Sequence, residues 1–286
     1  MIQLGYFLGA VLWLFLAQTA VFAADTPPPM IKLEAVPVYQ PHYFPFQPGE
    51  KEVYRATWNG LFAVATAEVQ ATPKVIEGKK VYQVRVEAKT SRVLDLIWKM
   101  RDTISSTFDA RTLTPSHFNF NQRENSRVID TDAKYDPGAK RWDVNRQQLG
   151  KRTKIYQFDS HNTLDPITAV YLARSTNFKV GDRLYFKLFG GRYQYLLELF
   201  VEKKEPIEME SGKSVEAFRV IPRIQNLTKK GYAGRLNEGI IWLSADERRL
   251  PLKLSSKIVF GAVHLELVDN KRATQSTAAD PNRPSS

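Results

Sequence analysis

The sequence predicts a mostly β protein, in which a strongly curved antiparallel sheet or open β-barrel carries one short helix from about Asp165 to Ser175. One observation is the alternation of apolar and polar residues over residues 250–260, because a period of two places every second side chain on one face of a strand. A second is the same alternation over residues 82–88. A third is the density of turn signals between short segments, without the fixed-period repeat that a propeller or solenoid requires.

The first half of the chain is predicted to form a meander of strands. Asn59-Gly60 is its strongest hairpin signal, because both residues tolerate the positive φ that a two-residue turn needs. A strand over residues 61–69 follows this turn. Further strands are expected at residues 82–88, 102–108, 116–123, 127–135, 140–144 and 154–158.

One helix interrupts the strands. Asp165 is suited to cap its first turn, and Pro166 fits the first helical position. The helical spacing places four residues on one side, Ile167, Val170, Tyr171 and Arg174. After it, strands are predicted at residues 183–188, 193–201 and 215–221, so the helix lies against one end of the sheet or inside it.

The stretch from residue 239 to 267 gives the clearest β pattern. A short apolar strand around Trp242 is followed by a polar turn over residues 244–249. From Leu250 the apolar residues are expected to share one face, with Ser256 as the one break. Gly261 interrupts the pattern, which predicts a bend or bulge in a curved sheet.

The two ends of the chain differ in composition from the part between them. Residues 1–23 contain no charged residue, carry an apolar run and end in small residues, as a secretory signal peptide does, although a retained membrane anchor is the alternative. Residues 24–47 are rich in proline and are expected to form a linker whose aromatic second half packs on the domain. Residues 48–271 are predicted to form a single β-rich domain, and residues 272–286 a disordered tail.

Three segments of the chain resemble a known family. They are Gly49-Glu50-Lys51-Glu52-Val53-Tyr54, the helical Asp165-Pro166-Ile167-Thr168-Ala169-Val170-Tyr171-Leu172, and the run from Gly239 through Trp242 to Pro251. Together they resemble an uncharacterised family of exported bacterial proteins, domain of unknown function 3108, from about Gly49 to Val268. The resemblance implies an antiparallel β protein of the cell envelope, and it supplies no activity and no site residues.

Composition limits the chemistry and the partners. Cysteine is absent, which excludes disulfides, thiolate metal sites and cysteine nucleophiles. The net charge of +11 lies wholly outside the uncharged leader, and it favours anionic partners. In an envelope these are an anionic lipid or an envelope polymer rather than nucleic acid, although a basic surface that only keeps the protein soluble is the alternative.

No motif for catalysis, metal binding or a cofactor is found, so no catalytic residue, metal site or cofactor is predicted. The four histidines lack metal-ligand spacing, and Gly212-Lys213-Ser214 lacks the upstream glycine of a phosphate-binding loop. Asp130 and Asp132 are expected to point to solvent from one strand face. A hydrolase assembled from distant strands, with His117 or His264 beside Asp130 or Glu266, is the third functional hypothesis.

Residues 91–100 join two predicted strands and are unusually apolar for a connection. One interpretation is a buried helical turn that closes an end of the barrel. The functional interpretation is an apolar lip at the mouth of a ligand cavity, carried by Leu94, Ile97 and Trp98.

Basic residues also gather in short clusters, and a solvated face is their ordinary explanation. If they meet in space, they would form a head-group site beside an apolar cavity, as an anionic amphiphile requires. The residues chosen for this site are Arg123, Arg127, Arg152 and Lys154, with Lys229, Lys230 and Arg235 in a further cluster.

The leading functional hypothesis is therefore a non-enzymatic binding or carrier protein for a lipid or other amphiphile, exported to the periplasm of a Gram-negative bacterium, with no membrane span once the leader is cleaved. The alternative is an envelope scaffold with a filled barrel, which binds glycan or a partner protein through its basic, aromatic surface. Trp58, Trp98, Trp142 and Trp242 are the candidates for sugar stacking.

Overall fold

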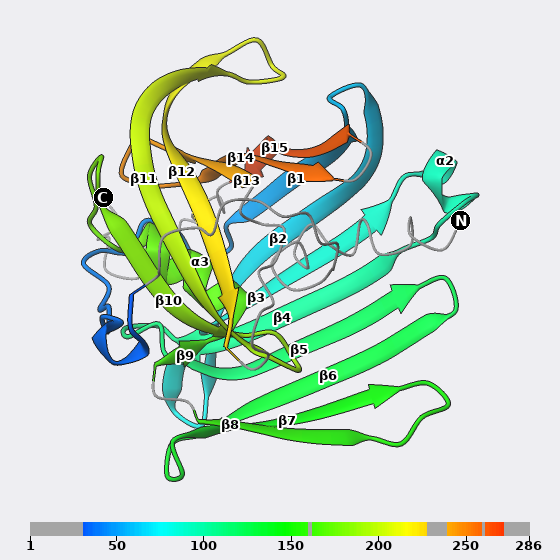
Figure 1. Ribbon diagram of the computed structural model, residues 1–286, viewed down its shortest axis with the longest axis vertical. Helices are drawn as coiled ribbons and strands as arrows, with labels where there is room; N and C mark the ends of the chain where they lie inside the picture. Colours follow the sequence, from blue (N-terminus) through cyan, green and yellow to red (C-terminus); the bar gives the residue numbers. More distant parts are fainter. Residues whose placement is uncertain (1–30, 160–161, 228–238, 259–260, 272–286) are drawn as a thin grey trace, which may run out of the picture.

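All strands of the computed structural model, which describes residues 31–159, 162–227, 239–258 and 261–271, belong to one 15-stranded sheet (Figure 1). The predictions for residues 1–30 and 272–286 and for Lys229, Lys230 and Arg235 fall outside the described residues. The strands are β1 Lys51–Trp58, β2 Phe62–Ile76, β3 Lys79–Thr90, β4 Arg101–Asp109, β5 Pro115–Glu124, β6 Arg127–Asp136, β7 Arg141–Gln148, β8 Lys154–Asp159, β9 Thr163–Leu164, β10 Arg183–Phe189, β11 Gln194–Glu208, β12 Ser214–Asn226, β13 Gly239–Ser244, β14 Pro251–Ile258 and β15 Gly261–Lys271.

The sheet runs in the order β8 to β1 and then β15 to β9, so the two halves of the chain join where β1 pairs with β15. Every pairing between neighbours is antiparallel except that of the two-residue β9 with β10. This confirms the mostly β, antiparallel prediction. Most predicted strand ends lie within four residues of the observed ones, because alternation reports directly on burial. The strands predicted to end at residues 69, 201 and 221, however, continue to Ile76, Glu208 and Asn226.

The curvature brings the two ends of the sheet together without backbone pairing. Trp142 of β7 donates from its indole Nε1 to the backbone oxygen of Thr163 in β9 over 3.0 Å. The ring of Phe189, at the end of β10, lies 4.5 Å from that of Trp142 and 5.4 Å from that of Phe118 in β5. The result is an open barrel whose seam is closed by side chains.

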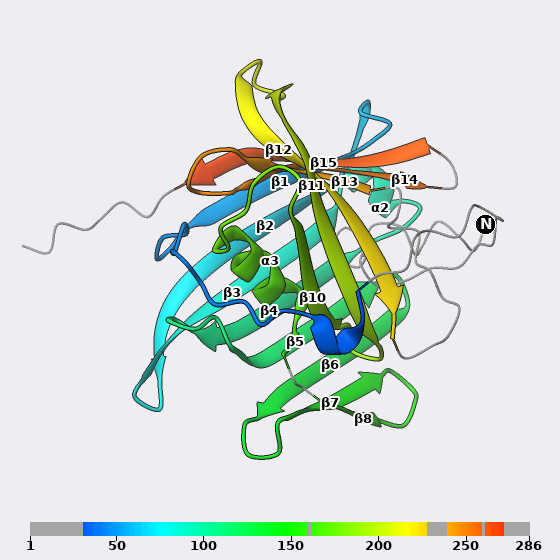
Figure 2. The same cartoon turned by 60° about the vertical axis from the view of Figure 1, so that its left-hand side comes forward.

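Helix α3, Pro166–Arg174, lies inside the curve of the sheet, with strands on either side of it (Figure 2). Asp165 caps it as predicted: its Oδ1 accepts from the amides of Ile167 and Thr168 at 2.9 and 3.0 Å. Its Oδ2 accepts from the hydroxyls of Thr168 and Ser106, which fixes the helix to β4. Because α3 is enclosed, it buries several sides and not only the predicted one, and Val170 is its most exposed apolar residue.

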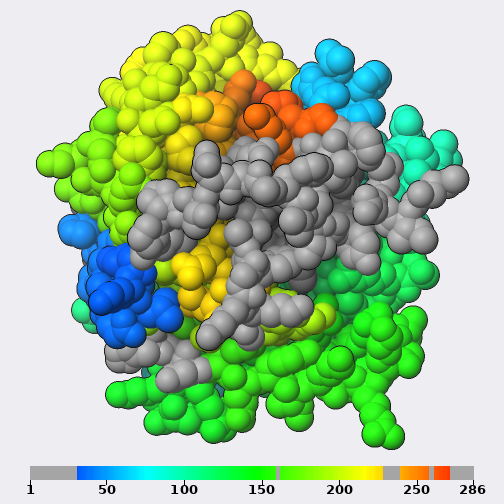
Figure 3. All heavy atoms as spheres, in the orientation of Figure 1, coloured from blue at the N-terminus to red at the C-terminus, as the bar shows by residue number. Residues whose placement is uncertain are grey.

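The segment before β1 packs along the barrel. We call this segment, residues 31–50, the strap. It begins with a short 3-10 helix, η2 Leu33–Ala35. Tyr39 lies 5.0 Å from the ring of Phe186, the amide of His42 donates to the Ser175 oxygen, and Phe46 is buried in the core beside Tyr171. Figure 3 shows the start of this strap, in dark blue, on the left of the molecule. The aromatic second half of the proline-rich segment therefore packs on the domain as expected.

The stretch from residue 239 to 271 forms three strands, but two details of the prediction are wrong. Leu250 and Leu252 pack with Met209 and Ala217, whereas Leu254 lines a pocket inside the barrel. The register of β13 with β14 shifts between Trp242 and Leu243, and such a shift breaks the alternation of faces. Gly261 begins β15 opposite Ile258, so it belongs to a hairpin and not to a bend within one strand.

Candidate functional site

An apolar pocket lies between α3 and the inner face of the central strands. Its volume is about 140 Å³. Strands β1, β2 and β3 form one wall, β13, β14 and β15 another, and α3 a third. The apolar lining comprises Tyr54, Ala67, Val69, Val84, Val86, Pro166, Ile167, Val170, Tyr171, Ile241, Pro251, Leu254 and Leu265.

Three charged residues, Glu52, Arg174 and Lys253, line this pocket, and Lys253 Nζ is paired with Glu266 over 3.0 Å. Arg174 is 1% exposed, and its guanidinium lies 3.3 Å from Glu52 Oε1 and 3.1 Å from Glu50 Oε1. Glu50 and Glu52 are themselves 2% and 3% exposed. A charge buried this deeply is tolerated only when it is paired and hydrogen-bonded. Glu50, Glu52 and Arg174 therefore form one ion network that connects the C-terminal turn of α3 to the start of β1.

Neighbouring groups complete the network. The Tyr54 hydroxyl donates to Glu52 Oε2 over 2.8 Å, and the amide of Gln47 donates to Glu50 Oε2 over 2.9 Å. Arg248, in the turn after β13, donates to Glu50 Oε1 over 3.2 Å, while its backbone oxygen accepts from Arg174 Nε over 3.3 Å. The network thus links α3, β1 and the turn between β13 and β14, and of these α3 and β1 line the pocket.

Burial and charge act differently on the two carboxylates. Burial raises the pKa of Glu52 to about 7, against the opposing attraction of Arg174. Burial also acts to raise the pKa of Glu50, but the Arg174 charge and hydrogen bonds outweigh it and hold that pKa below its usual value. A carboxyl group that titrates near neutral pH in an apolar pocket is a common feature of binding and catalytic sites.

The sequence analysis did not identify this network, because it assigned no site role to Glu50 and Glu52. Both residues are buried. One signal was available. Arg174 falls on the same helical side as Ile167 and Tyr171, and an arginine on a buried face requires acidic partners.

The predicted lip over residues 91–100 divides into a buried part and an exposed part. It contains a single helical turn, α2 Arg92–Asp95, whose cap Ser91 accepts from the Leu94 amide. Trp98 is 3% exposed and Leu94 is partly buried, and both pack in a small cluster with Met100, Ala56, Ala65 and Val263. Ile97, by contrast, is 70% exposed. None of Leu94, Ile97 and Trp98 lines the apolar pocket.

The predicted basic head-group residues lie at the β5–β6 and β7–β8 turns and not at the apolar pocket. Arg123 forms an ion pair with Asp130 over 2.6 Å, and Arg127 one with Glu124 over 3.4 Å. Arg152 and Lys154 are exposed in and after the turn between β7 and β8. The structure does not place these four residues around the pocket.

Other predicted polar sites are accounted for by pairs on the sheet surface. His117 Nε2 lies 2.5 Å from Asp132 Oδ1, and both side chains are partly exposed. Asp130 pairs with Arg123, and Glu266 lies 3.0 Å from Lys253 Nζ. Within residues 31–159, 162–227, 239–258 and 261–271, no group of three or more acidic or histidine side chains is arranged to hold a metal ion. None of the described helices has the length and apolar content that crossing a membrane demands.

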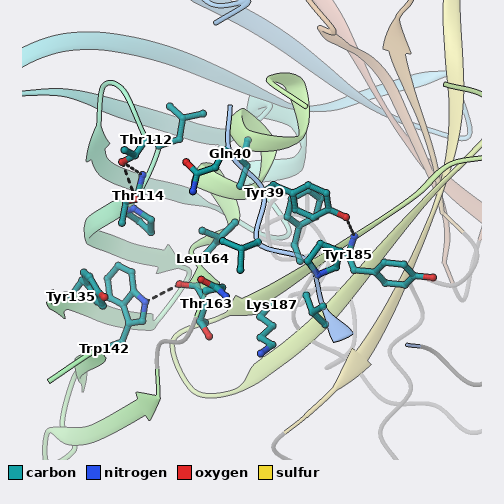
Figure 4. Close-up of a pocket in the computed structure, with 18 residues that line it drawn as sticks. Tyr39, Gln40, Thr112, Thr114, Tyr135, Trp142, Thr163, Leu164, Tyr185 and Lys187 are labelled. Atoms are coloured by element: carbon teal, nitrogen blue, oxygen red, sulfur yellow. Dashed lines mark hydrogen bonds between the residues drawn. The ribbon is translucent and has the colours of Figure 1, made fainter. Parts of the chain in front are cut away.

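A second pocket, of about 160 Å³, lies at the seam of the barrel (Figure 4). The strap residues 36–40 form one side of it, and Trp142, Thr163 and Lys187 lie on others. Some of its polar groups bond to one another: the Tyr39 hydroxyl accepts from the Tyr185 amide, and Trp142 donates to Thr163. These bonds hold the strap and the seam together, which favours a structural role for this pocket.

Near the α2 connection, the barrel interior carries a buried carboxyl group of which only one oxygen is hydrogen-bonded. Asp102 of β4 is 3% exposed. Its Oδ1 accepts from the Arg123 amide over 2.7 Å, whereas Oδ2 has no hydrogen-bond partner in the described part of the chain. Burial raises the pKa of Asp102 to about 7, and the charge of Glu124 acts in the same direction.

A pH-dependent stability is expected from Asp102. Because its folded pKa of about 7 lies above the ordinary 3.8, the group stabilises the fold below about pH 4 and loses that contribution as pH rises through 7. From pH 5 to pH 8 the loss is on the order of 2 kcal/mol. Denaturant unfolding at several pH values measures it, and Asp102→Asn should show a smaller loss. An unchanged pH profile in Asp102→Asn would contradict this assignment.

Comparisons with known proteins show the family of the chain and one solved structure of similar fold. A family model described as protein of unknown function (DUF3108) matches residues 53–268. The β-barrel-like protein of domain of unknown function DUF1849 from Brucella abortus aligns with a TM-score of 0.52 at 10% identity, over 79% of this chain and 98% of that one. A candidate exported protein with a YmcC-like fold from Bacteroides fragilis aligns with a TM-score of 0.36 at 7% identity, over 82% of this chain and 100% of that one. No curated protein matches the chain.

Proposed function

The chain belongs to the DUF3108 family, and from that premise we propose that it is a non-enzymatic binding or carrier protein for a lipid or other amphiphile in the bacterial cell envelope. The proposal places the apolar end of the ligand in the pocket beside α3. It places the protein in the periplasm of a Gram-negative bacterium, after removal of residues 1–23.

The apolar pocket is the observation that carries this proposal. Ligand sites are typically apolar cavities with a few polar groups that fix orientation, and here the charged residues Glu52, Arg174 and Lys253 line the cavity. The volume of about 140 Å³ is close to that of an engineered apolar cavity of about 150 Å³ that binds benzene. The pocket therefore suits one ring or a short length of an alkyl chain, and the remainder of the amphiphile would extend beyond it.

Filling the pocket tests the proposal. Ala67 lines it from β2 and is 6% exposed, so Ala67→Leu is expected to occupy the space that the ligand needs. Native mass spectrometry of the gently purified, exported protein should then show a bound amphiphile in the wild type and little or none in Ala67→Leu. Ala63→Leu adds the same volume to an exposed position of the same strand and should retain the ligand. A wild-type protein without any bound amphiphile would contradict the proposal.

A second candidate, an envelope scaffold, is favoured by the dense packing around α3. Aromatic rings of Phe46, Tyr82, Phe108 and Tyr171 fill that end of the barrel. Of the four predicted sugar-stacking residues, Trp58 is 41% exposed, whereas Trp98 and Trp142 are buried and Trp242 donates to Glu205. The mass-spectrometry experiment separates the two candidates, because a scaffold has no need of an amphiphile.

A further inference from the structure

A group of exposed apolar side chains lies at one end of the barrel. Among the described residues, the eight most exposed large hydrophobic side chains have exposed fractions of 63 to 87%. Seven of the eight lie in the β1–β2 turn, the α2 connection and the β7–β8 turn, or within the first two residues of the strands β2 and β8 that follow these turns. Soluble proteins rarely expose so many large apolar side chains together. We call this set the mouth rim; its members are Leu61, Phe62, Val93, Leu96, Ile97, Leu149 and Ile155.

Hydrogen bonds between neighbouring turns show that the rim is continuous. The Ser91 amide donates to the Val64 oxygen, which places α2 beside the start of β2. The Lys99 amide donates to Asn125 Oδ1 over 2.8 Å, which joins the same connection to the β5–β6 turn. The Leu149 amide donates to the Val128 oxygen, which joins that turn to the one between β7 and β8. These tips lie along the right-hand side of Figures 1 and 2.

The charge of the same turns is strongly positive. Residues 91–100 and 149–154 contain five exposed basic side chains for which the described structure records no ion pair: Arg92, Lys99, Lys151, Arg152 and Lys154. Asp95, the one acidic residue in these two segments, is already paired with Arg101. Exposed aliphatic residues interspersed with unpaired cations match a bilayer surface that carries anionic head groups.

From this combination we infer that the mouth rim docks on an anionic lipid bilayer, with its apolar side chains in the head-group region and its basic side chains against the lipid phosphates. The rim includes the exposed part of the connection predicted to be a ligand lip, so Ile97 contacts membrane and not the pocket. The inference stands on surface residues alone and is independent of the proposed pocket ligand.

Vesicle flotation of the exported protein tests the apolar part of the rim. The wild type should bind phosphatidylcholine vesicles that contain phosphatidylglycerol, and Leu96→Asp with Ile97→Asp should lower the partition coefficient by about tenfold or more. The matched control is Val75→Asp, because Val75 is 68% exposed and lies near the β2–β3 turn at the other end of the strands. This control should bind like the wild type, because Val75 lies outside the mouth rim. The N-terminus is the same in all variants, so it cannot account for a difference between them.

A second pair of variants tests the charge. Lys151→Ala with Arg152→Ala should lower binding to anionic vesicles by about fivefold for each charge removed, and should leave binding to pure phosphatidylcholine unchanged. Lys79→Ala with Lys80→Ala, on the exposed start of β3, is the control. Wild-type protein that binds no vesicles, or rim variants within twofold of the wild type, would overturn the inference. Ala67→Leu should bind vesicles normally, so a failed pocket and a failed rim give different results.

Discussion

Replacing Arg174 with methionine is expected to lower the free energy of unfolding by about 3–5 kcal/mol, as when one partner of a buried ion pair is removed. Glu52 then loses its cationic partner and Glu50 keeps only Arg248, in a barrel interior where each acid is at most 3% exposed. The methionine replaces most of the lost volume, so the expected loss is electrostatic and not a cavity effect. Denaturant unfolding at neutral pH measures it.

Neutralising the acids provides the control. In Arg174→Met with Glu50→Gln and Glu52→Gln, most of the lost stability should return, because an uncharged network no longer leaves buried charges unpaired. The side chains of Arg174 and Glu52 are in direct contact, so their effects on stability should be strongly non-additive. If the triple variant is as unstable as Arg174→Met, the network is not what sets the stability of this region.

Trp98→Asp is expected to destabilise the protein by about 4 kcal/mol or more, because it removes a buried aromatic ring and buries an unpaired carboxylate. Trp98 is 3% exposed and packs with Met100, Ala56 and Val263. Ile97→Asp, one residue away but 70% exposed, should change the unfolding free energy by about 0.5 kcal/mol or less.

The two variants are best compared by thermal unfolding in the same buffer. Such a difference between neighbouring residues can arise only if the connection is half core and half surface. Equal destabilisation by Trp98→Asp and Ile97→Asp would mean that the whole connection is buried. Equal tolerance would mean that Trp98 does not belong to the core.

Local patterns explain why much of the fold could be predicted. The strands around Tyr82 and Phe118 alternate in burial as they alternate in sequence. The capping of α3 by Asp165 depends on residues two and three positions away, which a sequence displays directly. The Asn59-Gly60 turn adopts φ values of 51° and 71°, as its composition requires.

The parts that could not be predicted depend on contacts between distant residues. Arg174 meets Glu50 and Glu52 across separations of 124 and 122 residues, and no local pattern joins them. In residues 91–100, an irregular connection has no period, so the sequence could not show that Trp98 turns inward and Ile97 outward. Leu252 and Leu254 were assigned to one face because a register shift leaves no mark on the alternation of leucines.

The proposed function is tested most directly by locating an apolar chain inside the barrel. Methyl-resolved NMR spectra recorded with a fatty acid that carries a paramagnetic label near its methyl end would show which side chains lie close to that end. The pocket predicts selective broadening of the methyl signals of Val69, Val86 and Leu254, which line it, while those of Leu250 and Leu252 stay sharp. Broadening confined to exposed methyl groups such as those of Leu149 and Ile155, or no broadening at all, would contradict a ligand in the pocket.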